Sequence, residues 1–281
     1  MDTLSLIETG FKSLPHEDST KNKAFQNIKT WLADHTLKDY LPYIEHLAAR
    51  GDFATLLDSF WRVMPFGTGG RRGAVGAGPN RINPYTVTLS VQGHADYLSQ
   101  VVGVGEKACV VVAYDVREFH DLKGVYGGVN GVLAGLTSRE MARQAATTYA
   151  ANGLVCYVVG PLQDEPKEAM CVDRYISTPE LSFLIRSLDA SGGVNISASH
   201  NHPDDNGAKV YNSRGGQEPP PHDEALLDMV EKVRQVRGMS YAKARAEGLI
   251  RFVPESLHQE YLRINIDCCP TDSRSAKVAY S

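Results

Sequence analysis

The chain has 281 residues, a length that allows one large domain or two ordinary ones. Hydrophobic residues make up 42% and charged residues 22%, a balance typical of a folded protein rather than a disordered one. The formal net charge of −4 gives no electrostatic footprint for nucleic acid or an anionic membrane, so neither partner is expected. Because net charge averages over the surface, a local basic pocket for phosphate stays compatible with it.

The sequence shows no pattern typical of a signal peptide or of a membrane-spanning segment. Residues 1–23 mix acids, lysines and prolines without the apolar core of a signal peptide, and the apolar stretches 108–114 and 154–160 are too short to span a bilayer. The five cysteines, at positions 109, 156, 171, 268 and 269, form no C-x-x-C pair. We therefore expect reduced cysteines and a cytoplasmic location, with a metal site or a strained disulfide at Cys268 and Cys269 as the alternative.

The first 63 residues are expected to form a helical N-terminal extension. Phe25, Ile28, Trp31 and Leu32 fall on one helical face, and a second apolar face covers residues 40–48. Strands and helices then alternate over residues 64–258, with helices predicted at 87–102, 138–151, 178–188 and 222–237 and strands at 108–114, 154–160, 194–198 and 208–212. Ser138 and Thr178 are the predicted helix caps, the latter followed by Pro179.

This alternation predicts a three-layer α/β/α domain with a mixed, mainly parallel sheet. Only about nine residues separate the last two strands, too few for a helical crossover, so these two strands are expected to pair antiparallel. The segment after the third strand then lies at the end of an interior strand, where ligands bind in such sheets.

Residues 195–211 carry the first chemically suggestive pattern. Ser199 ends a strand and can act as a nucleophile, with His200 as a proton carrier and Lys209 as a fixed cation. The same composition is also typical of a plain polar turn. The pair His200 and His202 suggests a metal site as a further alternative, although no third ligand stands at a suitable spacing.

A glycine- and arginine-rich segment at residues 66–73 is the second pattern. It matches neither a Walker A loop nor G-x-G-x-x-G. Its glycines expose backbone N–H groups that can cradle an anion, and Arg71 and Arg72 suit phosphate oxygens; a flexible surface loop is the alternative. Asp115 and Arg117, directly after the strand 108–114, form a third, weaker pattern.

Taken in order, these segments resemble the α-D-phosphohexomutases, the phosphoglucomutase/phosphomannomutase superfamily. Residues 197–201 (Ser-Ala-Ser-His-Asn) and 206–210 (Asn-Gly-Ala-Lys-Val) are similar to its phosphoserine loop, with His202 where proline is usual. Residues 66–73 resemble its F-G-T-x-G-x-R-G motif, and residues 114–117 its Y/G-x-D-x-R. Residues 76–87 are similar to the phosphoglucomutase/phosphopentomutase branch.

The resemblance implies intramolecular phosphate transfer on a sugar phosphate of the glucose 1-phosphate/glucose 6-phosphate class, through a phosphoserine at Ser199. It implies Mg²⁺, held partly by the phosphate on Ser199, and an activator of the glucose 1,6-bisphosphate type. Which of Lys209, Arg72 and His200 is the general base stays open. The implied catalytic residues are Ser199, His200, Lys209 and Arg72, and the implied substrate- or phosphate-binding residues are Thr68, Gly69, Arg117 and Asn201.

The family's D-G-D-x-D-R metal loop has no counterpart, since no D-x-D-x-D occurs in the sequence. Residues 259–281 are interpreted as a linker and the truncated start of a second domain, so we expect an incomplete, N-terminal part of such an enzyme. A non-catalytic relative that binds sugar phosphates or serves assembly is the alternative, and an unrelated phosphate-binding α/β domain is a further one. The sequence fixes neither the preferred sugar nor the oligomeric state.

Overall fold

The computed structural model describes residues 2–67, 69–101, 108–162, 175–269 and 277. Within these residues the strands form one six-stranded sheet with the spatial order β1-β5-β4-β2-β3-β6. The strands are β1 (Gly70–Ala74), β2 (Cys109–Tyr114), β3 (Val155–Val158), β4 (Gly192–Ile196), β5 (Asp205–Asn212) and β6 (Ile250–Phe252). β5 runs antiparallel to β1 and β4, whereas β4, β2, β3 and β6 run parallel. The predicted mixed, mainly parallel sheet is confirmed.

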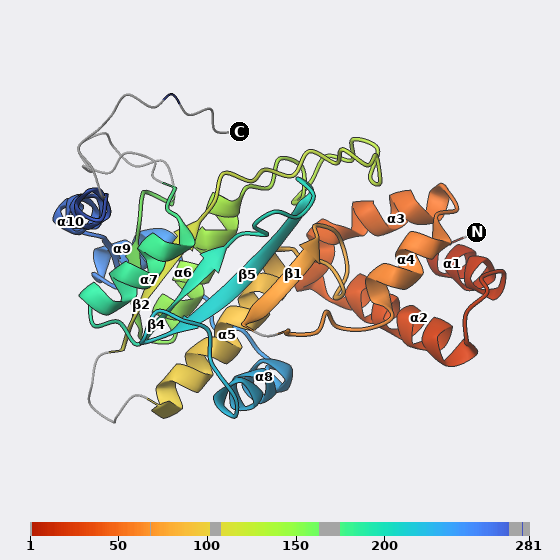
Figure 1. Cartoon of the computed structure of the whole chain (residues 1–281). Helices are drawn as coiled ribbons and strands as arrows, with labels where there is room; N and C mark the ends of the chain where they lie inside the picture. The colour runs from red at the N-terminus through yellow and green to blue at the C-terminus, as the bar shows by residue number, and fades with distance from the viewer. Residues whose placement is uncertain (1, 68, 102–107, 163–174, 270–276, 278–281) are drawn as a thin grey trace.

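Helices cover both faces of this sheet (Figure 1). α7 packs on one face with α10 outside it, and α5 and α6 pack on the other, followed by α8 and α9. Successive residues of β4 face opposite sides of the sheet. A side chain at Gly193 would meet Ile185 of α7, and one at Gly192 would approach His94 of α5. These helices are α5 (Pro84–Val101), α6 (Ser138–Ala151), α7 (Thr178–Ser187), α8 (His222–Lys232), α9 (Tyr241–Ala246) and α10 (Glu255–Asp267).

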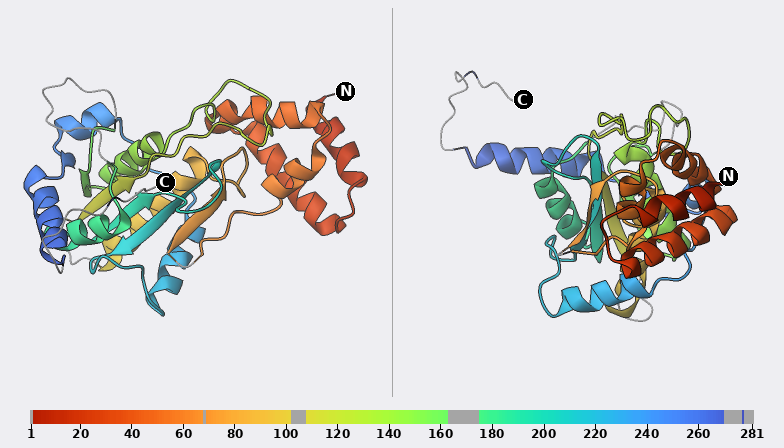
Figure 2. Two further views of the ribbon diagram at one scale, coloured as in Figure 1. Left: turned by 45° about the horizontal axis from the view of Figure 1, so that its top comes forward. Right: turned by 90° about the vertical axis from the view of Figure 1, so that its right-hand side faces the viewer.

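The N-terminal helices form a body beside the β1 edge of the sheet (Figures 1 and 2). Trp31 is its centre: its ring lies 5.1 Å from that of Tyr40 and 5.3 Å from those of Phe60 and Tyr85. Tyr85 belongs to α5, so one continuous apolar core joins this body to the sheet. The elements are α1 (Thr3–Lys12), α2 (Asp18–Ala33), the 3₁₀ helix η1 (His35–Tyr40), α3 (Leu41–Ala49) and α4 (Phe53–Phe60).

Several elements differ from the sequence-based expectation. The glycine- and arginine-rich segment contains strand β1, although glycine is depleted in strands; the strand exists because β5 supplies its hydrogen-bonding partner. A side chain at Gly70 would collide with the carbonyl oxygen of Ala208, so this pairing requires glycine there. The residues interpreted as a linker begin inside α10, and α9 and β6 were not anticipated, whereas α1 lies within the helical extension expected for the first 63 residues.

Helix boundaries shift by a few residues. Thr137, not Ser138, caps α6 in a capping box with Glu140, and Ser177, not Thr178, caps α7. α8 ends at Lys232 rather than at residue 237. No helix among the described residues is both long and apolar enough to cross a bilayer.

Candidate functional site

Ser199 stands in the loop between β4 and β5, at the carboxyl end of β4. Its side chain is exposed and its backbone φ of 55° lies in the left-handed region, which is costly for a residue other than glycine. The backbone N–H of Ser199 donates to the hydroxyl of Ser197 at 3.0 Å, which helps to hold this conformation. The loop therefore presents a serine hydroxyl to solvent on a fixed turn.

Arg117, which follows β2, holds the loop by its backbone. Its guanidinium also pairs with Asp115, Nε to Oδ2, at 3.3 Å. It donates to five loop carbonyls, those of Ser199 (2.8 Å), Asn201 (2.9 Å), His202 (2.7 Å), Pro203 (3.3 Å) and Asp205 (3.0 Å). All three guanidinium nitrogens thus face protein acceptors, and this geometry makes Arg117 a positioning residue. A direct contact with phosphate stays a prediction.

A buried polar network continues from this clamp. Asp115 Oδ1 accepts from the backbone N–H of Arg117 at 3.1 Å and from the hydroxyl of Ser138 at 2.6 Å. The same hydroxyl accepts from Asn206 Nδ2 at 2.9 Å. Ser138 and Asn206 are at most 2% exposed. The network ties β2, α6 and β5 together beneath the loop, and the sequence signalled Ser138 only as a helix cap.

Lys209, on β5, makes the contact that matters most for chemistry. Its Nζ donates to the hydroxyl oxygen of Ser199 at 2.6 Å. Burial lowers the pKa of Lys209, as does the positive charge of Arg72 and, less, that of Arg117, while Asp115 opposes the shift. A lysine held against a serine hydroxyl can stabilise negative charge on that oxygen and exchange a proton with it.

Arg72 shares the sheet face of Lys209. In the register of β1 and β5, Arg72 lies opposite Gly207 and Gly70 opposite Lys209, so the two cations are diagonal neighbours on one face. Arg72 is exposed, and its guanidinium has no partner among the described residues. A contact of Arg72 with phosphate stays a prediction.

Arg71 points the other way, contrary to the expectation that both arginines suit phosphate. It is 3% exposed and packs against α5. Its guanidinium donates to the carbonyl of Met64 at 2.9 Å, to that of Thr86 at 3.3 Å and to the hydroxyl of Ser90 at 3.2 Å. Burial lowers the pKa of Arg71 to about 10. This arginine builds the fold.

The remaining candidates lie near the loop without completing a site. Gly69 has a φ of 75° and its carbonyl accepts from the N–H of Val210 at 2.8 Å, which anchors the turn to β5. Asn201 donates its amide to Asp205 at 3.0 Å, inside the loop. His200 is exposed, and its ring has no partner among the described residues. Thr68 lies outside the described residues.

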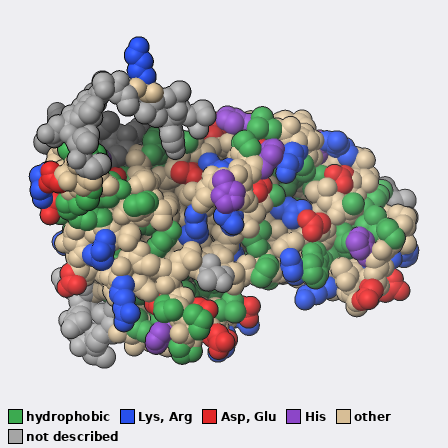
Figure 3. Space-filling view, in the orientation of Figure 1, with side chains coloured by type: hydrophobic (Ala, Val, Ile, Leu, Met, Phe, Trp, Pro, Cys, Tyr) green, Lys and Arg blue, Asp and Glu red, His purple; other side chains and the backbone are tan. Residues whose placement is uncertain are grey.

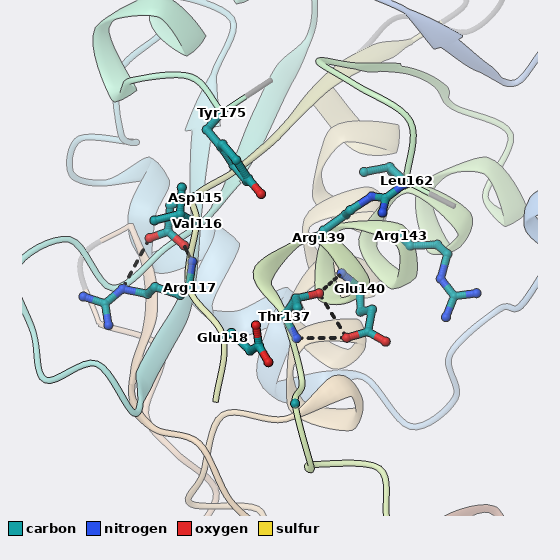
Figure 4. Close-up of a pocket in the computed structure, with 11 residues that line it drawn as sticks. Asp115, Val116, Arg117, Glu118, Thr137, Arg139, Glu140, Arg143, Leu162 and Tyr175 are labelled. Atoms are coloured by element: carbon teal, nitrogen blue, oxygen red, sulfur yellow. Dashed lines mark hydrogen bonds and ion pairs between the residues drawn. The ribbon is translucent and has the colours of Figure 1, made fainter. Parts of the chain in front are cut away.

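A cleft of about 770 Å³ opens beside Ser199. Its wall includes Arg117 and the start of α7 at Ser177 and Thr178, and its floor includes Asn195. A second hollow of about 460 Å³ adjoins it through Arg117 and its sequence neighbours (Figure 4). The face shown in Figure 3 carries histidine side chains beside lysine or arginine side chains near its centre. The smaller hollow is lined mainly by polar surface, whereas the cleft beside Ser199 also presents apolar surface, with Val116, Ile176 and Pro179 among its lining residues.

A metal site was tested against the same residues. The described part of the chain contains no group of three or more His, Cys, Asp or Glu side chains placed to hold a metal ion. The described residues therefore do not fit a complete Mg²⁺ site.

The comparison with known proteins identifies the fold unit. The family model described as phosphoglucomutase/phosphomannomutase, alpha/beta/alpha domain I, matches residues 63–122 and 135–237, more than half of the chain. The chain belongs to the phosphoglucomutase/phosphomannomutase family. Ser199, Lys209, Arg72 and Arg117 all fall inside the matched segments of this phosphosugar mutase domain, whereas the N-terminal helices and residues 123–134 fall outside them.

Curated relatives narrow the resemblance to one part of larger enzymes. The chain is 30% identical over 205 residues to the phosphoglucomutase of Staphylococcus saprophyticus, covering 72% of this chain and 31% of that protein. It is 30% identical over 207 residues to human phosphopentomutase (74% and 30%) and 33% identical over 189 residues to mouse glucose 1,6-bisphosphate synthase (67% and 26%). The chain thus spans about a third of the length of these mutase-family relatives.

Proposed function

We propose that this chain carries the phosphoryl-acceptor site of a phosphosugar mutase, with Ser199 as the residue that takes the phosphate. One observation carries the proposal: the 2.6 Å hydrogen bond from Lys209 Nζ to the exposed hydroxyl of Ser199. The left-handed turn at Ser199 and the Arg117 clamp support it, because phosphoryl transfer depends on fixed positioning of the nucleophile.

The proposed step is the attack of Ser199 Oγ on the phosphorus of a sugar bisphosphate. The Oγ–P bond forms and the bond from phosphorus to the sugar oxygen breaks, leaving phosphoserine and a sugar monophosphate. Ser199 loses one proton and the departing oxygen gains one, so no further reactant is needed. Lys209, charged at the start of the step, gives a proton to the departing oxygen and takes up the one from Ser199, and its charge stabilises the phosphate oxygens together with that of Arg72.

The substrate class rests on the relatives and on the chemistry of the site. The names phosphoglucomutase, phosphopentomutase and glucose 1,6-bisphosphate synthase describe proteins that act on phosphorylated sugars. We extend to this chain the part that those names share, a phosphorylated sugar, and propose the glucose 1-phosphate class because two of the three names refer to glucose. Ser199 lines the cleft, Lys209 contacts its hydroxyl and Arg72 lies diagonal to Lys209 on the same sheet face, an arrangement that suits such a ligand.

A single-turnover experiment tests this function. The chain is mixed with glucose 1,6-bisphosphate in excess and Mg²⁺, and glucose monophosphate is measured over time. We expect a burst that approaches one product molecule per chain in the wild type and in Ser213→Ala, an exposed serine at the far end of β5. Ser199→Ala should give no burst. A wild type that binds the bisphosphate without any burst would favour the non-catalytic binding protein instead.

A further inference from the structure

Asn195 is a buried polar residue that the proposed transfer step does not use. It lies in β4, the strand that leads to Ser199, and is 3% exposed. Its amide oxygen Oδ1 is buried and has no hydrogen-bond partner among the described residues. A buried acceptor without a donor costs free energy, so a structure that retains one needs a ligand or a water to supply the missing hydrogen bond.

The strand register places Asn195 next to the proposed chemistry. Asn195 lies directly opposite Lys209 in the antiparallel pairing of β4 and β5, so both side chains are neighbours on the same face of the sheet. Lys209 reaches from this row to the hydroxyl of Ser199. Ser197, two residues after Asn195 on the same face, accepts the N–H of Ser199. The unpaired oxygen therefore belongs to a side chain next to Lys209, on the same face of the sheet, and Lys209 contacts the nucleophile.

The orientation of the amide is fixed by α7. Asn195 Nδ2 donates to the hydroxyl of Thr178 at 3.3 Å, and that hydroxyl is in turn a hydrogen-bond partner of the Tyr211 side chain. Thr178 thus accepts from the amide nitrogen and leaves Oδ1 as the spare atom. Asn195, Thr178, Ser177 and Ser199 all line the same cleft of about 770 Å³. Asn195 therefore lines the space that a ligand at Ser199 would fill, and a ligand must displace a neighbouring group to reach the buried Oδ1.

We propose that Asn195 Oδ1 binds a hydroxyl group of the sugar phosphate that exchanges its phosphoryl group at Ser199. This inference rests on the proposed function in taking the ligand to be a sugar phosphate. A hydroxyl group donates the hydrogen bond that Oδ1 lacks, whereas a phosphate oxygen would be repelled by it. The ligand is then a sugar monophosphate or bisphosphate with a free hydroxyl close to the phosphate ester, and Asn195 determines which hydroxyl is required.

Binding to deoxy sugars tests this subsite without relying on catalysis. Ligand-observed NMR titrations measure the Kd of glucose 1-phosphate and of its 2-, 3- and 4-deoxy analogues. We expect the wild type to bind one of these analogues about tenfold more weakly than the parent, the value of one hydrogen bond of about 1.4 kcal/mol. Asn195→Leu should bind the parent as weakly as that analogue, and should leave the affinity for inorganic phosphate unchanged.

Asn195→Asp is the matched variant, because it keeps an oxygen at the position of Oδ1. It should retain the discrimination between the parent and the deoxy analogue, and it serves if Asn195→Leu does not fold. Equal Kd changes for the parent and all analogues in Asn195→Leu, or no change, would show that Asn195 only supports Thr178 or holds a structural water. A wild type that binds all four sugars equally, or binds none, would also overturn the subsite.

The single-turnover burst separates this inference from the proposed function. A burst at Ser199 without any deoxy discrimination leaves the function in place and removes the hydroxyl subsite. Discrimination that depends on Asn195 without a burst leaves the subsite in place and removes the transfer step.

Discussion

The two faces of the β1–β5–β4 edge use the same kinds of side chain for opposite purposes. Arg71 and Arg72 are sequence neighbours on β1, and the period of two along a strand sends them to opposite faces. Arg71 is buried against α5 with three acceptors within 3.3 Å. Arg72 is exposed beside Lys209 and has no partner among the described residues.

The difference between Arg71 and Arg72 indicates which face of the sheet carries the candidate site. On the α5 face the guanidinium is satisfied inside the protein, so it stabilises the fold. On the cleft face Arg72 and the amide oxygen of Asn195 keep unused hydrogen-bonding capacity, and Lys209 points at an exposed hydroxyl. Polar groups left open on one face only are what a ligand site requires.

The largest expected effect on the cleft face is that of Lys209→Met. Removing the ammonium group beside Ser199 should slow the single-turnover burst by roughly 10²–10³-fold, the typical cost of losing one charge-stabilising donor. The unfolding midpoint in urea should stay close to that of the wild type, because the methionine side chain fills a similar volume. A burst within about threefold of the wild-type rate would separate Lys209 from the chemistry.

On the opposite face, Arg71→Leu should act on stability. The substitution leaves the carbonyl of Met64 without its donor, while that of Thr86 keeps the hydroxyl of Ser90, and we expect a loss of about 2 kcal/mol in the free energy of unfolding. Arg72→Leu is the matched control and should change that free energy by less than about 0.5 kcal/mol. Urea denaturation measures both. Equal losses in the two variants would contradict the division between the faces.

Arg117→Met probes the clamp that joins the fold to the site. Five loop carbonyls lose their shared donor, but they lie near the surface where water can replace it, so we expect a loss of about 1–2 kcal/mol of stability. The burst should slow by about tenfold as the turn at Ser199 loosens. If Arg117 contacts phosphate directly, the variant should also show a higher Kd for inorganic phosphate. If Arg117 only positions the loop, that Kd should stay nearly unchanged.

The smallest effect is a shift in pH dependence. Burial and Arg72 lower the pKa of Lys209 below its ordinary value of 10.5. The charged form exists below that pKa, so the burst rate should fall as the pH rises through a value under 10.5. In Arg72→Leu the positive charge that helps to lower the pKa of Lys209 is removed, so this pKa rises. The fall of the burst rate at alkaline pH should then move to higher pH. A fall that stays at the same pH would show that Arg72 does not act on Lys209.

Strand periodicity and loop length were enough to predict the mixed sheet, and the resemblance to the phosphohexomutase motifs singled out Ser199, Lys209 and Arg72 as candidates. The contacts that organise them were not readable, because they join distant residues: Arg117 and the loop carbonyls are 82 to 88 positions apart. Asn195 gave no signal, since an asparagine in a strand looks like any polar interruption until its partners are known. Strand β1 was hidden by its glycines, whose value lies in the close approach to β5.

Site mapping of the phosphoryl group tests the central claim most directly. After incubation with glucose 1,6-bisphosphate and Mg²⁺, the chain is digested and its peptides are sequenced by mass spectrometry. We expect one phosphoryl group on Ser199 and none on Ser197, the buried serine two residues earlier, with the label lost on addition of glucose 1-phosphate. Phosphate on another residue, or an unmodified Ser199 in a folded chain that binds the bisphosphate, would contradict it.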